Sequence, residues 1–340
     1  MLDRPRPALE FEPRAVEWLP GSSGRIPRDM LTYVVGLPDL GKTLWGHRLT
    51  ANATRAGLNV IFSNIEDGPE QVTRPRLEAA GAILERVGLF TPHSFPRIPD
   101  ELDLLRAYVR AVDLVILDPL SPHLTVAVRN GQAVRRALDP VVELALETHT
   151  TVVGIGHGIK SIKSKSSPLD IVPGPHEGIA GASHAIYLFG HHPENADERV
   201  LVNLRLKVAE QPKTMAFEID TAEVQTSDGS ILEAPFLHDV ADDLSVDWWA
   251  AVQASRRQAG PPVSKVEAAA QWLTDVLAAA EPNPIESGNL KLEAANAGIS
   301  WRTVRRAAKD LELEIVPPKG PGTHSLWRLP EDHPLRSSGT

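Results

Sequence analysis

The sequence predicts an α/β protein, in which a mainly parallel sheet is flanked by helices and followed by a small domain of helices and a hairpin. Over residues 17–235, apolar strand-like runs alternate with stretches of helical spacing, and this order is typical of a doubly wound sheet. Over residues 263–330, helical stretches precede two short strands, which is the order of a winged helix-turn-helix. We therefore expect two domains of different size.

Strands are expected at the apolar runs, and the first four runs are nearly continuous, as in parallel strands buried on both faces. The runs cover residues 31–35, 59–64, 114–117, 151–155, 185–189, 200–206 and 215–219. We expect the later strands to form antiparallel hairpins at one side of the sheet. Helical spacing predicts helices over residues 44–56, 69–80, 100–111 and 132–148.

Composition marks the remaining boundaries. Residues 1–16 are rich in proline and charge and are expected to form an arm. Residues 236–262 are acidic and end in Gly-Pro-Pro, which predicts a linker in which Trp248 and Trp249 would pack a short helix onto the core. In the second domain we expect helices over residues 266–279, 290–297 and 301–311, strands over 313–316 and 325–329, and a tail at 331–340.

Length and composition exclude several classes of protein. The 340 residues suffice for one large and one small domain. No apolar run approaches the roughly 18 residues that cross a bilayer, and no secretory signal is visible, so we expect a cytoplasmic protein without membrane contact. The absence of cysteine excludes disulfides and thiolate metal sites. The net charge of −9 argues against a uniformly basic nucleic-acid-binding surface and leaves local basic surfaces open.

A phosphate-loop pattern, G-x-x-x-x-G-K-T, lies between the first strand and the first helix. Its residues are Gly36, Leu37, Pro38, Asp39, Leu40, Gly41, Lys42 and Thr43, with Leu44 next in the helix. The glycines let the backbone amides curl around an anion, and the helix N-terminus adds partial positive charge. Lys42 would reach the phosphates and Thr43 would ligate Mg²⁺, so the pattern predicts binding of ATP with Mg²⁺. Asp39 stands where many such loops have a small residue, and its carboxylate would weaken the affinity.

Acidic residues follow two of the apolar strands. Glu66 comes just after the second strand, where a carboxylate can orient or deprotonate the attacking water. Asp67 is the alternative, and a solvated acidic turn is the plainer interpretation of both. The strand that begins after Asp113 ends in Asp118, as a Walker B strand does, and this carboxylate would hold Mg²⁺ directly or through water.

The fourth strand ends in His157, which could sense the γ-phosphate and pass its presence to the following loop, or could simply bond a neighbouring carbonyl. That loop, residues 158–178, looks long and unstructured, and such loops are usually functional or disordered. Its lysines predict contact with the DNA backbone, unless the loop is merely solvated. They are Lys160, Lys163 and Lys165.

Two cations lie on a late strand. Period-two alternation places Arg205 and Lys207 on one face, and Leu204 and Leu206 on the other. Cations exposed together at a sheet edge could act as fingers on the ATP of a neighbouring subunit, an effect of about 10³–10⁵ in rate. The alternative is a charged edge that keeps the strand soluble.

The helix expected over residues 301–311, for which Ser300 is a plausible N-cap, has two faces. Trp301, Val304, Ala308 and Leu311 form an apolar face, and Arg302, Arg305, Arg306 and Lys309 form a basic one. This pattern is typical of a recognition helix that meets DNA phosphates or bases. A basic face is also often only a solvated face.

In this order, the motifs resemble those of the RecA-like ATPases related to plasmid RepA-type hexameric replicative helicases. The likeness covers about residues 17–330 and includes Trp18-Leu19-Pro20-Gly21, the phosphate loop, Ile65-Glu66-Asp67, Arg74-Pro75-Arg76-Leu77, Leu117-Asp118-Pro119-Leu120, His157, Gly178-Ile179-Ala180-Gly181-Ala182-Ser183 and Thr303-Val304-Arg305-Arg306-Ala307. The sequence departs from the family pattern at Asp29 and Asp39, in the segment after Ser183, and at His157-Gly158-Ile159-Lys160.

The resemblance implies a RecA fold, a ring of six subunits, ATP between subunits and single-stranded DNA in a central channel. Lys42 and Thr43 would then bind phosphate and Mg²⁺, and Glu66 would activate water. Asp118 would support Mg²⁺, while His157 would couple nucleotide to the DNA loop. Arg205 and Lys207 would act on the neighbouring subunit.

The sequence therefore predicts a Mg²⁺-dependent ATPase of phage or plasmid type that acts on DNA as a ring-forming helicase or translocase, with possible duplex contact through the winged helix. One alternative is an ATP switch, such as an initiator, loader or regulator, that assembles without unwinding. Another is a small-molecule P-loop kinase, which would leave the second domain unexplained.

Overall fold

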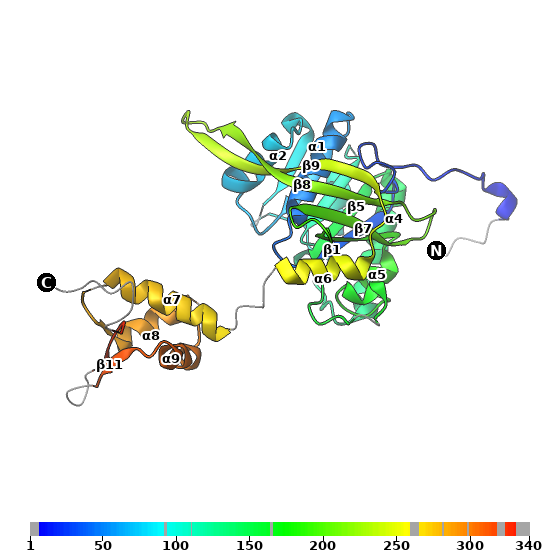
Figure 1. Cartoon of the computed structure of the whole chain (residues 1–340). Helices are drawn as coiled ribbons and strands as arrows, with labels where there is room; N and C mark the ends of the chain where they lie inside the picture. Colours follow the sequence, from blue (N-terminus) through cyan, green and yellow to red (C-terminus); the bar gives the residue numbers. More distant parts are fainter. Residues whose placement is uncertain are drawn as a thin grey trace. The chain divides into compact units, whose positions relative to one another are not determined.

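The chain forms two compact units, Met1–Gln258 and Ala259–Thr340. The structure, a computed structural model, describes residues 7–91, 94–109, 111–163, 166–258, 265–280, 282–297, 299–317 and 324–330 (Figure 1). Across these ranges no helix has the length and apolar character that crossing a membrane requires.

A nine-stranded sheet lies at the centre of the first unit, in the order β3-β2-β4-β5-β1-β6-β7-β8-β9. The strands are β1 (Leu31–Gly36), β2 (Val60–Asn64), β3 (Val87–Phe90), β4 (Leu114–Asp118), β5 (Thr151–His157), β6 (Ala185–His191), β7 (Glu198–Leu206), β8 (Thr214–Gln225) and β9 (Ile231–Leu244). From β3 to β6 every pairing is parallel, and from β6 to β9 every pairing is antiparallel. The predicted parallel sheet with antiparallel strands at one side is confirmed.

Helices cover both faces of this sheet (Figure 1). They are α1 (Lys42–Arg55), α2 (Arg74–Ala79), α3 (Leu102–Val109), α4 (Gly131–Thr148), α5 (Ile179–Ala182) and α6 (Trp248–Gln258), with short turns at Ala8–Glu10, Pro69–Thr73, Leu84–Arg86, Ser121–His123 and Pro168–Ile171. Successive β4 side chains enter opposite cores: Val115 packs with α3, α4 and α6, and Ile116 packs with α1. This two-sided burial is why the parallel strands read as continuous apolar runs.

The predicted linker over residues 236–262 is wrong for most of its length, because residues 236–244 complete β9 and residues 248–258 form α6. The acidic composition hides a strand whose inward residues, Ala234 and Leu237, are buried. Asp239 of β9 forms an ion pair with the buried Arg48 of α1. Trp248 and Trp249 pack α6 against the core, as expected.

β8 and β9 form a hairpin that extends past the rest of the sheet (Figure 1). The two strands pair from Thr214↔Leu244 to Gln225↔Ile231, so β8 is much longer than the run at 215–219 suggested. The edge strand β3 also has no counterpart among the predicted strands. Both are strands whose side chains are only partly buried, and such strands lack a continuous apolar signal.

The second unit contains three helices and a small sheet. The elements are α7 (Lys265–Ala280), α8 (Ser287–Asn296), α9 (Trp301–Asp310), β10 (Ile285–Glu286), β11 (Glu314–Val316) and β12 (Leu326–Arg328), with strand order β10-β12-β11. Leu273, Leu290 and Val304, one from each helix, are fully buried together with Trp327 of β12. The Ser300 hydroxyl accepts a hydrogen bond from the Thr303 amide at 3.2 Å and begins α9, where the sequence predicts an N-cap.

Candidate nucleotide-binding site

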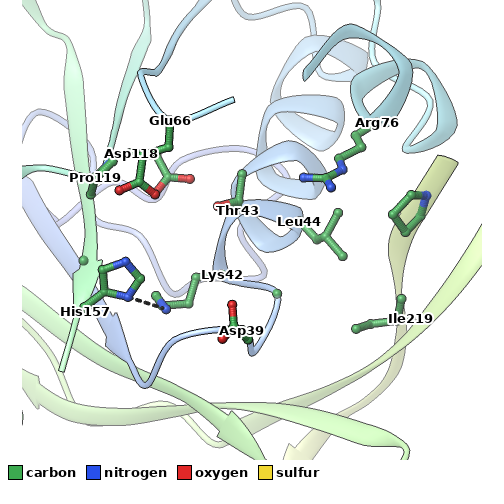
Figure 2. A pocket seen from close by; sticks show the side chains of 13 residues that line it. Asp39, Lys42, Thr43, Leu44, Glu66, Arg76, Asp118, Pro119, His157 and Ile219 are labelled. Atoms are coloured by element: carbon green, nitrogen blue, oxygen red, sulfur yellow. Dashed lines mark hydrogen bonds between the residues drawn. The ribbon is translucent and has the colours of Figure 1, made fainter. Parts of the chain in front are cut away.

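The carboxyl ends of β1, β2, β4 and β5 meet at one edge of the sheet, because these strands are parallel. A cavity of about 480 Å³ opens there. It is lined by Asp39, Gly41, Lys42, Thr43, Leu44, Glu66, Arg76, Asp118, Pro119, Gly156, His157, Ile219 and Pro235. Figure 2 shows Glu66, Asp118 and His157 on one side of the phosphate loop, and Arg76, Leu44 and Ile219 on the other.

The phosphate loop is curled, not extended. Asp39 and Gly41 both have left-handed backbone, with φ of 62° and 90°. A Cβ built on Gly36 would lie 2.3 Å from the carbonyl oxygen of Phe189, so only glycine allows β1 to pass this close to β6. Asp39 is exposed and stands at the rim of the cavity without filling it (Figure 2).

The ammonium group of Lys42 lies across this curl. Its Nζ donates a 2.7 Å hydrogen bond to the Leu37 carbonyl and lies 3.4 Å from Nδ1 of His157. Burial lowers the pKa of Lys42 to about 8, while the charges of Asp118, Asp39 and Glu66 oppose that change. Burial, together with the charge of Lys42, also lowers the pKa of His157. Within the described residues this ammonium has no ion pair, so an anion entering the cavity would be its first close counter-charge.

The end of β4 offers a partly unsatisfied carboxylate. Asp118 accepts a hydrogen bond from the Thr43 hydroxyl. Its Oδ2 is buried and has no hydrogen-bond partner among the described residues. Burial raises the pKa of Asp118 to about 6, and the bond from Thr43 and the charge of Lys42 limit the rise.

This donor set fits Mg²⁺, which proteins often bind through one or two oxygen ligands while substrate phosphates supply others. Within the described ranges, no three His, Asp or Glu side chains converge as a cage made only by protein would require. Thr43 and Asp118 are the residues that would hold the ion.

The turn after β2 gives its two acids different surroundings. The side-chain oxygen of Asn64 accepts the backbone N–H groups of Glu66 and Asp67, each at 3.1 Å. The carboxylate of Asp67 accepts from the Asn64 amide at 3.0 Å and pairs with Arg76 at 3.4 Å. Glu66 lines the cavity, whereas Asp67 does not.

Sequence reasoning missed several residues of this cavity. Arg76 comes from α2, and Ile219 and Pro235 come from the β8–β9 hairpin. No local pattern marks the hairpin residues, since they lie far along the chain from the phosphate loop. Arg76 lies in a segment that supports the family resemblance, but its residue type alone suggests only a solvated helix.

Arg205 and Lys207 lie at the opposite end of the sheet from their own cavity. They follow the part of β7 that pairs with the start of β6. Arg205 donates to the carbonyls of Ala180 and Ser183, and Lys207 donates to that of Gly181 at 2.8 Å. Partial burial, with Arg205 and Arg135 close by, lowers the pKa of Lys207 to about 8.

The predicted alternation along β7 is wrong at Leu204. The register shifts between Ile186 and Tyr187 of β6, so Leu204 is an extra residue in the ladder. Leu204 therefore packs in one core and Leu206 in the other, because a bulge changes which face each side chain takes.

The loop over residues 158–178 is more ordered than the sequence suggests. Ile162 and Ile171 are buried, and Ser167 and Asp170 form a capping box. Arg256 of α6 donates to the carbonyls of Lys160 and Ile162 at 2.6 and 2.8 Å. The side chains of Lys160 and Lys163 remain exposed, and Lys165 lies outside the described residues.

On α9, Arg305, Arg306 and Lys309 are exposed, while Val304 and Ala308 are buried. The two predicted faces are therefore present. The side chain of Arg302 lies outside the described residues, although its backbone is part of the helix.

The sheet order, the curled phosphate loop after β1 and the buried carboxylate at the end of β4 define the first unit as a RecA-like P-loop ATPase domain. In agreement, residues 4–161 match a family model described as "AAA domain". A solved structure described as the ATPase domain of another protein is similar, with 12% sequence identity and a TM-score of 0.44, over 56% of this chain and 81% of that chain. At this level the likeness says nothing of what the present chain acts on. None of the curated proteins compared matches the sequence.

Proposed function

We propose that the protein is a Mg²⁺-dependent ATPase that acts on DNA as a ring-forming, RepA-like helicase or translocase of a phage or plasmid. One observation carries the ATPase part: Lys42, Thr43, Glu66 and Asp118 come from separate elements and line a single cavity. Binding a triphosphate there would satisfy the buried ammonium of Lys42, and Thr43 and Asp118 would hold the metal. When bound, Mg²⁺ supplies positive charge that neutralises the phosphate oxygens.

Glu66 is the proposed general base. Its backbone is fixed by Asn64, and its carboxylate lines the cavity on the Asp118 side (Figure 2). It can orient water and accept its proton. Asp67 is already bonded to Asn64 and Arg76, which favours Glu66 for this role.

The other side of the cavity suits a nucleobase. Leu44, Ile219 and Pro235 are apolar and lie away from the charged residues of the loop. Such contacts bury the flat faces of a base without reading its edge, so we expect weak discrimination among purine nucleotides.

His157 is the proposed link between nucleotide and DNA. It lies 3.4 Å from Lys42, and the next residue, Gly158, donates its N–H to the Gly36 carbonyl at 2.9 Å. A change at the phosphate loop would thus reach the segment with Lys160, Lys163 and Lys165, which we propose contacts single-stranded DNA in the channel of a ring.

Arg205 and Lys207 are proposed to act on the ATP of the adjacent subunit. Their place at the far end of the sheet makes a role in their own cavity impossible without refolding. Their hydrogen bonds to α5 would have to be exchanged for phosphate contacts when the ring assembles. We propose a homohexamer.

The second unit is proposed to be a winged helix-turn-helix in which Arg302, Arg305, Arg306 and Lys309 of α9 meet DNA. The three exposed cations also favour the alternative function, an ATP-switch initiator, loader or regulator. Charge reversal at Arg305 and Arg306 separates the two. A regulator should lose its DNA binding, whereas a motor should keep DNA-stimulated ATP turnover.

The proposal is tested by measuring ATP hydrolysis and oligomeric state for the unmodified chain and for Lys42→Ala, each with and without single-stranded DNA. We expect turnover that DNA stimulates, a ring in the presence of ATP, and loss of turnover in the variant. If DNA changed neither turnover nor oligomeric state, the motor proposal would fail and the regulator would remain.

A further inference from the structure

A second hollow, of about 420 Å³, lies on α9 in the small unit. Among the described residues it is lined by Trp301, Arg305, Arg306 and Lys309. Trp301, Arg305 and Lys309 follow one another at intervals of four residues, so they form a stripe along one side of the helix. An aromatic ring and three cations therefore share one concave surface.

The cations of this hollow are not used by the fold. The side chains of Arg305, Arg306 and Lys309 are exposed and make no hydrogen bond or ion pair with another described residue. By contrast, Arg328 of the same unit is paired with Glu314. Side chains that hold the unit together are thus distinct from those that line the hollow.

The aromatic ring is held in place from behind. Trp301 packs against Trp327 of β12, with ring centroids 5.3 Å apart and planes inclined by 34°. Trp301 is only partly buried, so some of its surface remains available in the hollow. A ring fixed in this way can stack on a flat ligand with little loss of side-chain entropy.

We infer that this hollow binds single-stranded DNA, with an unpaired base stacked on Trp301 and the adjoining phosphates paired with Arg305, Arg306 and Lys309. The inference rests on the proposed DNA-directed function and specifies the ligand of α9. Stacking on aromatic rings and contact with cations are the two components of single-strand binding. In a duplex the faces of the bases are covered by their neighbours, so Trp301 would have no partner there.

The test compares labelled strands of about 12 nucleotides, a length within the range such sites take, by fluorescence anisotropy at one fixed salt concentration. The probes are oligo-dT, an abasic strand of equal length, and a duplex. The protein is the full chain carrying Lys160→Gln and Lys163→Gln, which reduces binding by the proposed channel loop. The abasic strand keeps the phosphates and removes only the stacking.

We expect oligo-dT to bind roughly 5- to 100-fold more tightly than the abasic strand, as one stacked base would provide, and more tightly than the duplex. Trp301→Leu should remove the preference for oligo-dT over the abasic strand, and Trp301→Phe should retain most of it. Lys309→Gln is the matched control, since it should weaken both strands by the same factor.

Equal affinity for oligo-dT and the abasic strand would overturn the inference, as would tightest binding to the duplex. If Trp301→Leu unfolds the small unit in a thermal melt, the probe comparison on the parent protein and the Trp301→Phe variant still decide. Basal ATP turnover, measured without DNA, tests the proposed ATPase separately, so a failure of one proposal can be told from a failure of the other.

Discussion

The depressed pKa of Lys42 predicts that nucleotide affinity depends on pH in the alkaline range. In the free protein this pKa is about 8, because the ammonium is buried. Triphosphate beside it would favour the charged form and raise the pKa. Below about pH 8 the lysine is charged in both states, and affinity is highest. Above it, the free protein loses a proton that the complex retains, so affinity falls by up to tenfold for each pH unit.

The size of the effect follows from the same values. If bound nucleotide returns the pKa from about 8 to its ordinary value of 10.5, the coupling is about 3.4 kcal/mol at 1.36 kcal/mol per pH unit. Affinity should then fall by at most about 300-fold between pH 7 and pH 11. The assay is equilibrium titration with a fluorescent ATP analogue across this range.

Two variants make the assignment specific. Lys42→Arg keeps its charge throughout the range, since the guanidinium does not deprotonate, and should show a much flatter profile. Lys42→Ala should bind weakly at every pH. The reasoning is refuted if the unmodified protein binds equally well at pH 7 and pH 10, or if Lys42→Ala keeps the alkaline decline.

Four further predictions concern the same cavity. Glu66→Gln should lower kcat by about 10²–10⁴ with little change in nucleotide affinity, and Asp67→Asn should affect kcat less; similar losses would contradict the assignment of the base. Asp118→Asn should raise the Mg²⁺ concentration for half-maximal turnover by about tenfold or more, as a metal titration would reveal. In the unmodified protein, Mg²⁺ affinity should fall below about pH 6, where Asp118 takes up its proton. Gly36→Ala should lower both the Tm and ATP binding, because its Cβ would meet the Phe189 carbonyl at 2.3 Å; calorimetry with an unchanged Tm would count against this.

Much of the site was predictable because its central parts are local in sequence. A run from Gly36 to Thr43 contains both the flexible backbone and the lysine that a phosphate loop needs. Glu66, Asp118 and His157 follow apolar strands, and parallel strands bring their carboxyl ends to one edge. Strand type and order alone therefore place these residues together.

The boundaries of the domain were less predictable. Residues 236–258 look like a linker by composition, yet they form the end of β9 and α6. Their inward residues acquire a partner only when β8 and α1 are in place, and Asp239 is accommodated by an ion pair with Arg48. An acidic composition reports solvent exposure of one face and says little about pairing of the backbone.

By itself, the sequence determined the α/β class and the phosphate loop with the strand-end residues around it, because backbone conformation and strand direction depend on contiguous residues. Only the tertiary structure placed Arg76, Ile219 and Pro235 at the cavity and paired Lys207 with α5. It also decided the bulge at Leu204. These features arise from packing between segments far apart in the chain, and such packing leaves no periodic pattern in the sequence.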